Sequence, residues 1–211
     1  MPPAPDGLAV RTLDFDGLPI AWDSRVLEPR PWTAAQSRWA AELASGLPAG
    51  PVLELCCGAG QIGLLTAALC GRDLVAVDLD PAACELTRMN AAAARLGDRV
   101  EVREGDLAEV LGAHERFPLV VADPPWVPRA QVGRYPDDPV LAIDGGPDGL
   151  DVARHCLGVA ERHVAPGGSV VLQLGTSAQA ARLSQESPSL AVREVRSAEG
   201  GVLVRLDAPA R

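Results

Sequence analysis

Four consecutive residues, Asp123-Pro124-Pro125-Trp126, place a carboxyl group and an aromatic ring on either side of two prolines. They follow an apolar run at 118–122 that is typical of a buried strand. Two successive prolines remove two backbone donors and fix two φ angles, so the chain leaves this strand along a rigid path. A stiff strand exit would account for that pattern. The alternative is a site that holds an acid and a ring at fixed positions.

A glycine-rich turn follows an earlier apolar run, at 51–55. Gly58, Gly60 and Gly63 have a G-x-G-x-x-G spacing, which brings the backbone close to a ligand at the start of a helix. This spacing alone is weak evidence, because glycines at such turns often serve only tight packing. Asp78 ends the next apolar run, twenty positions after Gly58, where a carboxylate can accept hydrogen bonds from both hydroxyls of a ribose.

Two more acids end the third and fourth apolar runs. Asp106 follows the run at 99–103 and could accept a hydrogen bond from an adenine amino group, and Asp123 follows the fourth run. A single acid after a strand is more often a helix N-cap or a loop carboxylate, as we expect for Asp80 before Pro81. A glycine turn or an acid at four consecutive strand ends favours a nucleoside-binding edge instead.

The elements that must position these residues alternate between short apolar runs and helical patterns. We expect strands at 51–55, 73–78, 99–103, 118–122, 169–174, 190–196 and 201–206. We expect helices at 60–70, 81–97, 107–111, 150–163 and 177–185.

This alternation predicts an α/β fold with a seven-stranded, mostly parallel sheet and helices on both faces. The last two runs, joined by a short turn, predict an antiparallel C-terminal strand pair. Asp16-Gly17 between two further runs predicts a short N-terminal hairpin. We therefore divide the chain into an N-terminal hairpin extension, residues 1–30, and one domain, residues 31–211.

Composition limits the classes of partner and cofactor. The 211 residues carry 19 basic and 28 acidic side chains, for a net charge of −9, and every basic residue is arginine. The chain thus has neither a P-loop lysine nor a Schiff-base lysine. An acidic chain lacks the broad positive field of non-specific nucleic-acid binding, so nucleic acid is disfavoured, although a local patch at Arg129 and Arg134 stays open.

The cysteines and the apolar segments bear on the compartment. Five cysteines without a Cys-x-x-Cys spacing predict neither a disulfide framework nor a zinc site, so we expect no metal. The sequence shows no signal-peptide pattern and no apolar run of the roughly 20 residues that a membrane helix needs. We expect a cytoplasmic protein with no membrane partner.

The glycines and Asp78 suit either a dinucleotide or S-adenosylmethionine, since both present an adenosine ribose. The Asp123-Pro124-Pro125-Trp126 motif distinguishes the two cofactors, because hydride transfer from a dinucleotide has no evident use for an acid and a ring held by prolines. Methyl transfer to an sp² nitrogen requires a lone pair aimed at the sulfonium methyl while acceptors hold the N–H groups. Asp123 and a proline carbonyl could be those acceptors, and Trp126 could stack on a planar group or contact the cation.

The segments VLELCCGAGQIGL, AVDLD, GDL, VVADPPW and HVAPGGSVVLQLG together resemble class I S-adenosylmethionine-dependent methyltransferases with an (Asn/Asp)-Pro-Pro-aromatic motif. Within that group the chain is most similar to the HemK/PrmC-type protein-glutamine N-methyltransferases, which methylate a glutamine side-chain amide in translation release factors. RVLEPRPWT and YPDDPVLAIDGGPDGLDVAR resemble the segments of that family on either side of the shared core. The resemblance implies a Rossmann-like methyltransferase domain at 31–211.

The resemblance also implies the roles of individual residues. Those around S-adenosyl-L-methionine would be Thr33, Glu54, Cys56, Gly58, Gly60, Asp78, Leu79, Asp106, Leu107 and Asp123. Those at the reacting nitrogen would be Asp123, Pro124, Pro125 and Trp126. Short members of the family are similar in length to this chain, and the resemblance implies an activating partner protein for them.

Four positions depart from the family pattern: Cys56 replaces glycine, Asp123 asparagine, Trp126 tyrosine and Trp32 an acid. Asparagine both accepts from and donates to a carboxamide, whereas an ionised aspartate only accepts, which suits an amine at least as well as glutamine. Asn90 is the only asparagine in the chain, so compositional drift is an open explanation of the change at position 123.

The predicted function is S-adenosylmethionine-dependent N-methylation of a planar amide or amine nitrogen, in a protein glutamine or in a small-molecule or peptide amine. One alternative is methylation of an exocyclic nucleobase amine, because other families with Asp-Pro-Pro-aromatic motifs perform it. A second alternative is a catalytically silent, cofactor-binding scaffold, which the changes at Cys56 and Asp123 leave open.

Overall fold

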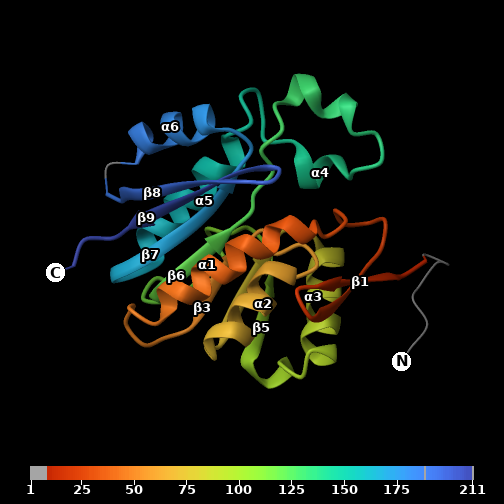
Figure 1. Ribbon diagram of the computed structural model, residues 1–211, viewed down its shortest axis with the longest axis horizontal. Coiled ribbons are helices and arrows are strands. Elements are labelled where there is room, and N and C mark those ends of the chain that lie inside the picture. The colour runs from red at the N-terminus through yellow and green to blue at the C-terminus, as the bar shows by residue number, and fades with distance from the viewer. Residues whose placement is uncertain (1–8, 188, 211) are drawn as a thin grey trace.

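The computed structural model describes residues 9–187 and 189–210. A seven-stranded sheet in the order β5-β4-β3-β6-β7-β9-β8 forms the centre of the protein (Figure 1). Its strands are β3 (Val52–Leu55), β4 (Leu74–Asp78), β5 (Val100–Glu104), β6 (Phe117–Ala122), β7 (Val164–Leu174), β8 (Ala191–Ala198) and β9 (Gly201–Asp207). The first five in this order are parallel, and β9 is antiparallel to both β7 and β8. The predicted α/β sheet and its antiparallel C-terminal pair are confirmed.

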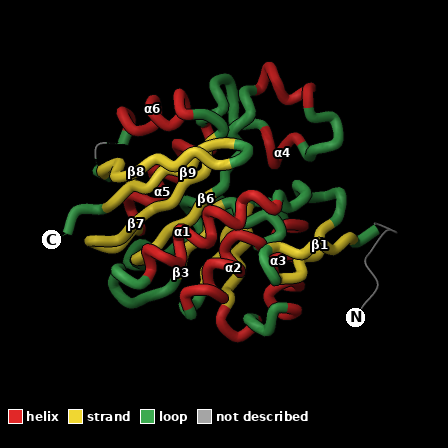
Figure 2. Tube along the Cα trace, viewed as in Figure 1, coloured by secondary structure: helices red, strands yellow, loops and turns green. Residues whose placement is uncertain are grey.

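Helices cover both faces of the sheet (Figures 1 and 2). The α-helices are α1 (Ala34–Ala44), α2 (Gln61–Cys70), α3 (Pro81–Ala93), α4 (Val140–Ile143), α5 (Asp151–His163) and α6 (Ser177–Glu186). Short 3-10 helices lie at η2 (Pro31–Thr33), η3 (Gly97–Arg99) and η4 (Arg129–Arg134). Helices α1, α2 and α3 share one hydrophobic core with one face of the sheet, and α5 and α6 share another with the opposite face.

The central strands read as continuous apolar runs because both of their faces are covered. Every residue of β3 and β6 is buried. Alternate residues of β3 face opposite cores, with Val52 in the α1–α3 core and Leu53 in the α5–α6 core. The chain crosses between the two faces next to β3, so the loops after β3, β4 and β6 meet at one edge, where ligands bind in sheets of this type.

The predicted N-terminal hairpin consists of β1 (Arg11–Phe15) and β2 (Leu18–Trp22). Asp16 and Gly17 both have positive φ, at 54° and 91°, as a two-residue type I′ turn requires. Phe15 and Ile20 are fully buried in the core of α1, α2 and α3. The hairpin therefore shares a core with the rest of the chain, and the division at residue 30 stays a prediction.

Three element boundaries differ from the sequence-based expectation. Residues 107–111 form a single turn and not a helix, in which Glu109 N and Val110 N both donate to Asp106 O, at 3.0 and 3.1 Å. Helix α3 ends at Ala93 and not at Gly97, since Arg95 has a φ of 59°. Strand β7 begins at Val164, five residues early, and reaches its partner β6 through an irregular register.

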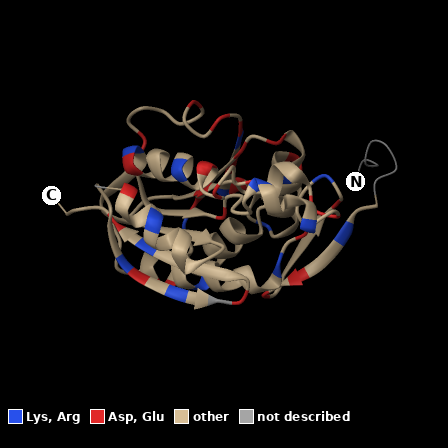
Figure 3. Ribbon diagram, turned by 90° about the horizontal axis from the view of Figure 1, so that it is seen from above, with Lys and Arg blue, Asp and Glu red and all other residues tan. Residues whose placement is uncertain are grey.

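No helix in the described ranges is both long and apolar enough to cross a membrane. Arginine positions and acidic positions lie interspersed along the ribbon (Figure 3).

Candidate active site

A cavity of about 370 Å³ opens at the carboxyl ends of β3, β4 and β6. Five carboxyl groups line it, contributed by Asp78, Asp80, Asp106, Asp123 and Asp151. Arg25 and His155 are the basic side chains that the described residues add to its wall. The remaining wall is largely apolar. A cavity with this excess of carboxyl groups favours a cationic ligand.

Asp78, the last residue of β4, has both carboxyl oxygens held by backbone donors. Oδ2 accepts from Gly58 N at 2.9 Å, and Oδ1 accepts from Asp80 N at 3.0 Å. Burial raises the pKa of this carboxyl, and the two amide hydrogen bonds partly offset the rise. Each oxygen has a further lone pair and the residue lines the cavity, which suits two ribose hydroxyls.

The three glycines of the turn have different roles. Gly58 lines the cavity with a φ of +54°, and a Cβ at this position would enter open space. A Cβ at Gly60 would lie 2.8 Å from the Thr87 methyl group, and one at Gly63 would overlap the Glu54 carboxyl. Gly58 therefore keeps ligand space open, whereas Gly60 and Gly63 let α2 pack closely.

Asp106 and Leu107 lie on the wall after β5. Asp106 Oδ1 accepts from Ala108 N at 2.8 Å and lies 3.2 Å from His155 Nε2. The hydrogen bond from Ala108, with a smaller contribution from His155, holds the pKa of Asp106 below its ordinary value. Leu79 also lines the cavity with its side chain largely exposed, so these residues lie where the sequence predicted an adenosine.

Asp123 faces the cavity directly after β6. Among the described residues, none donates a hydrogen bond to its carboxyl oxygens, although the residue is half-buried. Burial raises the pKa of Asp123 to about 7. This carboxyl is therefore free to bind a ligand and close to half protonated at neutral pH.

The rest of the Asp-Pro-Pro-Trp motif divides between the cavity and the protein interior. Pro125 lines the cavity, and Pro124 is buried behind it. The Trp126 ring lies against Gly175, where a Cβ would overlap the indole, and it is outside the cavity wall. Trp126 thus packs against the β7–α6 junction in this structure, and its stacking on an acceptor stays a prediction.

Two predicted cofactor residues lie behind the wall. Glu54 is completely buried in β3, where Oε1 accepts from Gly63 N at 2.8 Å. Burial raises its pKa to about 8. Thr33 is buried beside α1, and its hydroxyl donates to the Arg30 carbonyl at 2.8 Å. Thr33, Glu54 and Gly60 are therefore not among the residues that line the cavity, and their contact with the cofactor stays a prediction.

Cys56 stands at the cavity wall in the left-handed region, with a φ of 60°. Its Sγ lies 3.7 Å from Cys156 Sγ of α5. The contact with Cys156, together with burial, raises the pKa of the Cys56 thiol well above its ordinary range. The side chain is thus accommodated against α5 although the backbone conformation favours glycine.

Sequence reasoning missed several residues of the wall. Arg25 reaches it from the segment after β2, held by Asp23 at 2.7 Å and Glu85 at 2.9 Å. Gln61 presents a buried Oε1 without a partner in the described part of the chain. The helical spacing of residues 150–163 placed His155 on a helix but carried no sign that it faces Asp106.

The wall distinguishes the two cofactors that share an adenosine. A dinucleotide would bring a doubly charged pyrophosphate among five carboxyl groups and one guanidinium, which is electrostatically unfavourable. S-adenosylmethionine carries a sulfonium cation and an ammonium group, which the carboxyl groups of the wall attract. The residues present therefore fit S-adenosylmethionine, and a ribose contact at Asp78 and Gly58 stays a prediction.

Comparison with known proteins supports this assignment. A family model described as a methyltransferase domain matches residues 52–133. The release factor glutamine methyltransferase of Deinococcus radiodurans is 34% identical over 204 residues, which are 94% of this chain and 69% of that protein. The chain belongs to the HemK/PrmC-type glutamine methyltransferase family. The family resemblance in the sequence is thereby confirmed, and so is S-adenosylmethionine as its cofactor.

Other members of the HemK/PrmC family differ in the protein they act on. The ribosomal protein uL3 glutamine methyltransferase of Bradyrhizobium diazoefficiens is 32% identical over 81% of this chain and 57% of that protein. A release factor glutamine methyltransferase from Clostridium acetobutylicum is 30% identical over 77% of this chain and 60% of that protein. The chain thus spans about 60% of the length of these two relatives.

Solved structures show the same fold at lower identity. The hMettl16 catalytic domain, in complex with an RNA hairpin, superposes with a TM-score of 0.73 at 18% identity, over 94% of this chain and 76% of that chain. An RNA methyltransferase from Salinibacter ruber, in complex with S-adenosyl-L-homocysteine, has a TM-score of 0.57 at 21% identity, over 88% of this chain and 95% of that chain. These similarities establish a Rossmann-like methyltransferase fold.

Proposed function

We propose that this protein is an S-adenosylmethionine-dependent N-methyltransferase whose acceptor is the side-chain amide of a protein glutamine. The observation that carries the proposal is the Asp123 carboxyl, which faces the cofactor cavity without a partner among the described residues. Family members at 30% to 34% identity are named for glutamine methylation of a release factor or of ribosomal protein uL3.

The aspartate at position 123 is compatible with a glutamine acceptor because of its protonation. In the ionised form, its oxygens only accept hydrogen bonds. With a pKa of about 7, a large fraction of the protein without cofactor carries this proton at neutral pH, and the protonated carboxyl presents one O–H donor beside one carbonyl acceptor. That pair matches the donor and acceptor of asparagine, so protonated Asp123 can pair with both the oxygen and the N–H of a carboxamide.

The chain's own residues supply position and electrostatics. S-adenosylmethionine, when bound, supplies an electrophilic methyl group. Asp78 and the Gly58 turn fix the adenosine side of the cavity, and Asp123 with the rigid prolines fixes the acceptor nitrogen. Holding the two reactants in line accounts for most of the rate of such a displacement. The excess of cavity carboxyl groups stabilises the positive charge of the sulfonium.

Labelling with methyl-tritiated S-adenosylmethionine tests the proposal. The purified protein is incubated separately with a full-length bacterial release factor, with ribosomal protein uL3 and with bulk transfer RNA. We expect label in one of the two proteins, located on a glutamine by mass spectrometry of its peptides. Label in RNA, or on a lysine or terminal amine alone, would contradict a glutamine acceptor and favour an amine.

We infer further that an activating partner protein supports the reaction, as the resemblance to short members of the family implies. We also infer that the reaction takes place in the cytoplasm. The five cysteines are free thiols, as a reducing compartment requires. Adding fractionated lysate to the purified protein and a release factor should raise the initial rate in a protease-sensitive fraction. A rate that no fraction changes would contradict the partner and leave the methyltransferase proposal intact.

A further inference from the structure

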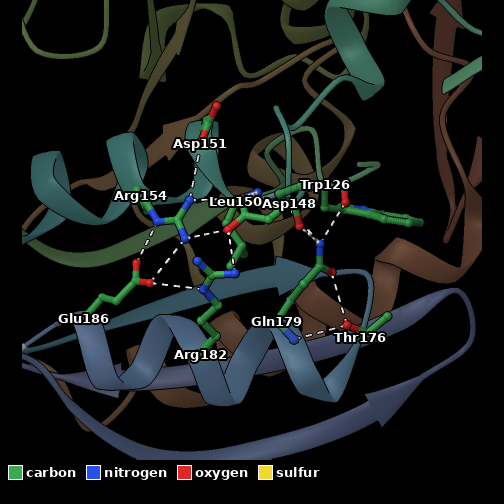
Figure 4. A network of polar contacts seen from close by, with 10 residues as sticks. Trp126, Asp148, Leu150, Asp151, Arg154, Thr176, Gln179, Arg182 and Glu186 are labelled. Carbon is green, nitrogen blue, oxygen red and sulfur yellow. Dashed lines mark hydrogen bonds and ion pairs between the residues drawn. The ribbon is translucent and has the colours of Figure 1, made fainter. Parts of the chain in front are cut away.

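The Asp123–Trp126 segment, here called the acceptor motif because it would hold the methyl acceptor, ends at the Trp126 carbonyl. A side chain from α6 binds this carbonyl (Figure 4). Gln179 Nε2 donates to Trp126 O at 2.9 Å and lies 3.3 Å from both Asp148 O and Gly149 O. An amide NH₂ has two hydrogens, so it can serve Trp126 and one or both of the other carbonyls together. A single side chain thus joins the acceptor motif to the loop before α5.

Two glycines pack closely against the half-buried Trp126. A Cβ at Gly175 would overlap the indole, and a Cβ at Gly149 would overlap the Trp126 carbonyl oxygen. Backbone hydrogen bonds continue the attachment, since Val127 N donates to Ile143 O at 3.0 Å and Gly145 N donates to Val127 O at 2.9 Å. The residue after the two prolines is therefore held in a close-fitting socket made by the β7–α6 junction and the loop before α5.

The socket is itself anchored to two helices. Thr176, the N-cap of α6, accepts from Gln179 N at 3.1 Å. The Asp148 carboxyl pairs with Arg154 of α5 at 2.8 Å and with Arg182 of α6 at 3.0 Å. Figure 4 shows these contacts converging on the loop that carries the Asp148 carbonyl. Gln179 therefore connects the acceptor motif to a part of the chain whose position is fixed from several directions.

We propose that Gln179 is a positioning residue for the acceptor, which fixes the path of the Asp123–Trp126 segment by binding the Trp126 carbonyl. The inference rests on the proposed methyltransferase function. Gln179 is absent from the cavity wall, so it acts through Trp126 and touches neither reactant. Prolines restrict φ but leave ψ free. The hydrogen bond to Trp126 O fixes the position of the carboxyl end of the segment, which the two prolines do not fix. A displacement of about 1 Å at an acceptor can reduce the rate by about a hundredfold.

Three α6 variants separate positioning from folding. Gln179→Ala removes the donors, and Gln179→Glu keeps the shape while turning a carboxylate toward three carbonyl oxygens. Gln185→Ala is the control on the same helix, where the side chain is exposed. Each is measured for S-adenosylmethionine affinity by calorimetry, for kcat and KM with a full-length bacterial release factor, and for hydrogen exchange of peptides that cover residues 124–130.

We expect Gln179→Ala to lower kcat at least fivefold, and Gln179→Glu to lower it further. The cofactor dissociation constant should change less than twofold, exchange at Val127 should become faster, and Gln185→Ala should match the wild type. Unchanged kcat and exchange in both variants would overturn the proposal, as would a rate loss that only follows a lower folded fraction. Faster exchange at Val127 in a protein that methylates no glutamine would support the socket and refute the proposed function instead.

Discussion

Asp78 and Asp123 are carboxyl groups of the same cavity with different surroundings. Burial raises the pKa of both groups, but two backbone hydrogen bonds partly offset the rise for Asp78, whereas no hydrogen bond from the described residues offsets it for Asp123. The first group is therefore prepared to accept hydrogen bonds from a ribose, and the second can change its protonation when a ligand arrives. The chemistry of each residue follows from these neighbours rather than from its type.

Asp78→Asn tests the ribose contact. The substitution keeps size but loses the charge that strengthens two hydrogen bonds, so S-adenosylmethionine should bind more than tenfold weaker, or about 2 to 4 kcal/mol. Isothermal titration calorimetry on folded protein measures this. Asp98→Asn, an exposed acid away from the cavity, is the control. Equal affinity in the wild type and Asp78→Asn would remove Asp78 from the cofactor site.

The pH dependence of acceptor methylation tests Asp123. Its pKa of about 7 means that the protonated form declines as pH rises through neutrality. In wild type, kcat/KM for a glutamine acceptor should therefore fall on the alkaline side, by up to about tenfold per pH unit. The bound sulfonium favours the ionised form and moves the midpoint to lower pH.

Asp123→Asn is the matched variant for this profile. Asparagine offers a donor and an acceptor at every pH, so its kcat/KM should lack the alkaline fall and equal or exceed the wild-type value above pH 8. A wild-type profile that runs parallel to that of Asp123→Asn would contradict a role for the Asp123 proton. Loss of all activity in Asp123→Asn would instead favour an amine acceptor that needs a carboxylate.

At the scale of elements, a single buried side chain of α3 joins the N-terminal hairpin to the core by hydrogen bonds. Asn90 Nδ2 donates to Ala21 O and Ala59 O, both at 2.8 Å, and its Oδ1 accepts from Ala21 N at 2.9 Å. The only asparagine of the chain thus joins β2, the glycine turn and α3. The Asn90 side chain therefore positions both the hairpin and the glycine turn.

Asn90→Ala should lower the free energy of unfolding by about 2 to 4 kcal/mol, because it leaves buried backbone groups without partners. Urea denaturation followed by circular dichroism gives the value. Arg88→Ala, exposed on the same helix, should cost less than about 0.5 kcal/mol. If the two variants were equally stable, the hairpin would be held by its apolar contacts alone.

At the scale of the whole molecule, buried carboxyl groups make stability depend on pH. Glu54 has a pKa of about 8 in the folded protein, against about 4 in an unfolded chain. The folded state therefore keeps a proton that the unfolded state has released. The stabilisation is complete below about pH 4 and is lost as pH rises toward 8, by up to about 1.4 kcal/mol per pH unit.

Glu54→Gln removes this titration, so its unfolding free energy should vary less between pH 5 and 8 than that of the wild type. Chemical denaturation at three pH values is the measurement. Glu109→Gln makes the same change of charge at an exposed position and should keep the wild-type dependence. If the unfolding free energy of Glu54→Gln varied with pH as steeply as that of the wild type, the titrating group would be a residue other than Glu54.

The surface charge bears on nucleic acid. Arg129, one of the two arginines that a local patch would need, is paired with Asp144 at 2.9 Å. Acidic and arginine positions are also interspersed along the ribbon (Figure 3). Single-stranded RNA should therefore bind weakly, and a rise from 50 to 200 mM salt should weaken it further. Fluorescence anisotropy with a labelled 20-nucleotide RNA measures this, and tight binding insensitive to salt would favour the nucleobase alternative.

The sequence by itself determined the sheet and the edge at which the site lies. Buried parallel strands must be apolar throughout, and side chains that end them must meet at one edge, so Asp78, Asp106 and Asp123 could be placed together before any coordinates were known. The hairpin turn was equally local, because Asp16-Gly17 needs only its own positive φ angles.

The tertiary structure decided which of these residues face the cavity and what holds them. Glu54 and Gly60 are not among the residues that line the cavity, Gln61 and Arg25 reach it, and Trp126 lies in a socket closed by Gln179, 53 positions later in the chain. Such contacts depend on packing between distant segments, which no local pattern encodes. Burial likewise sets the protonation of Asp123, because the cost of removing a charge from water depends on every atom around it.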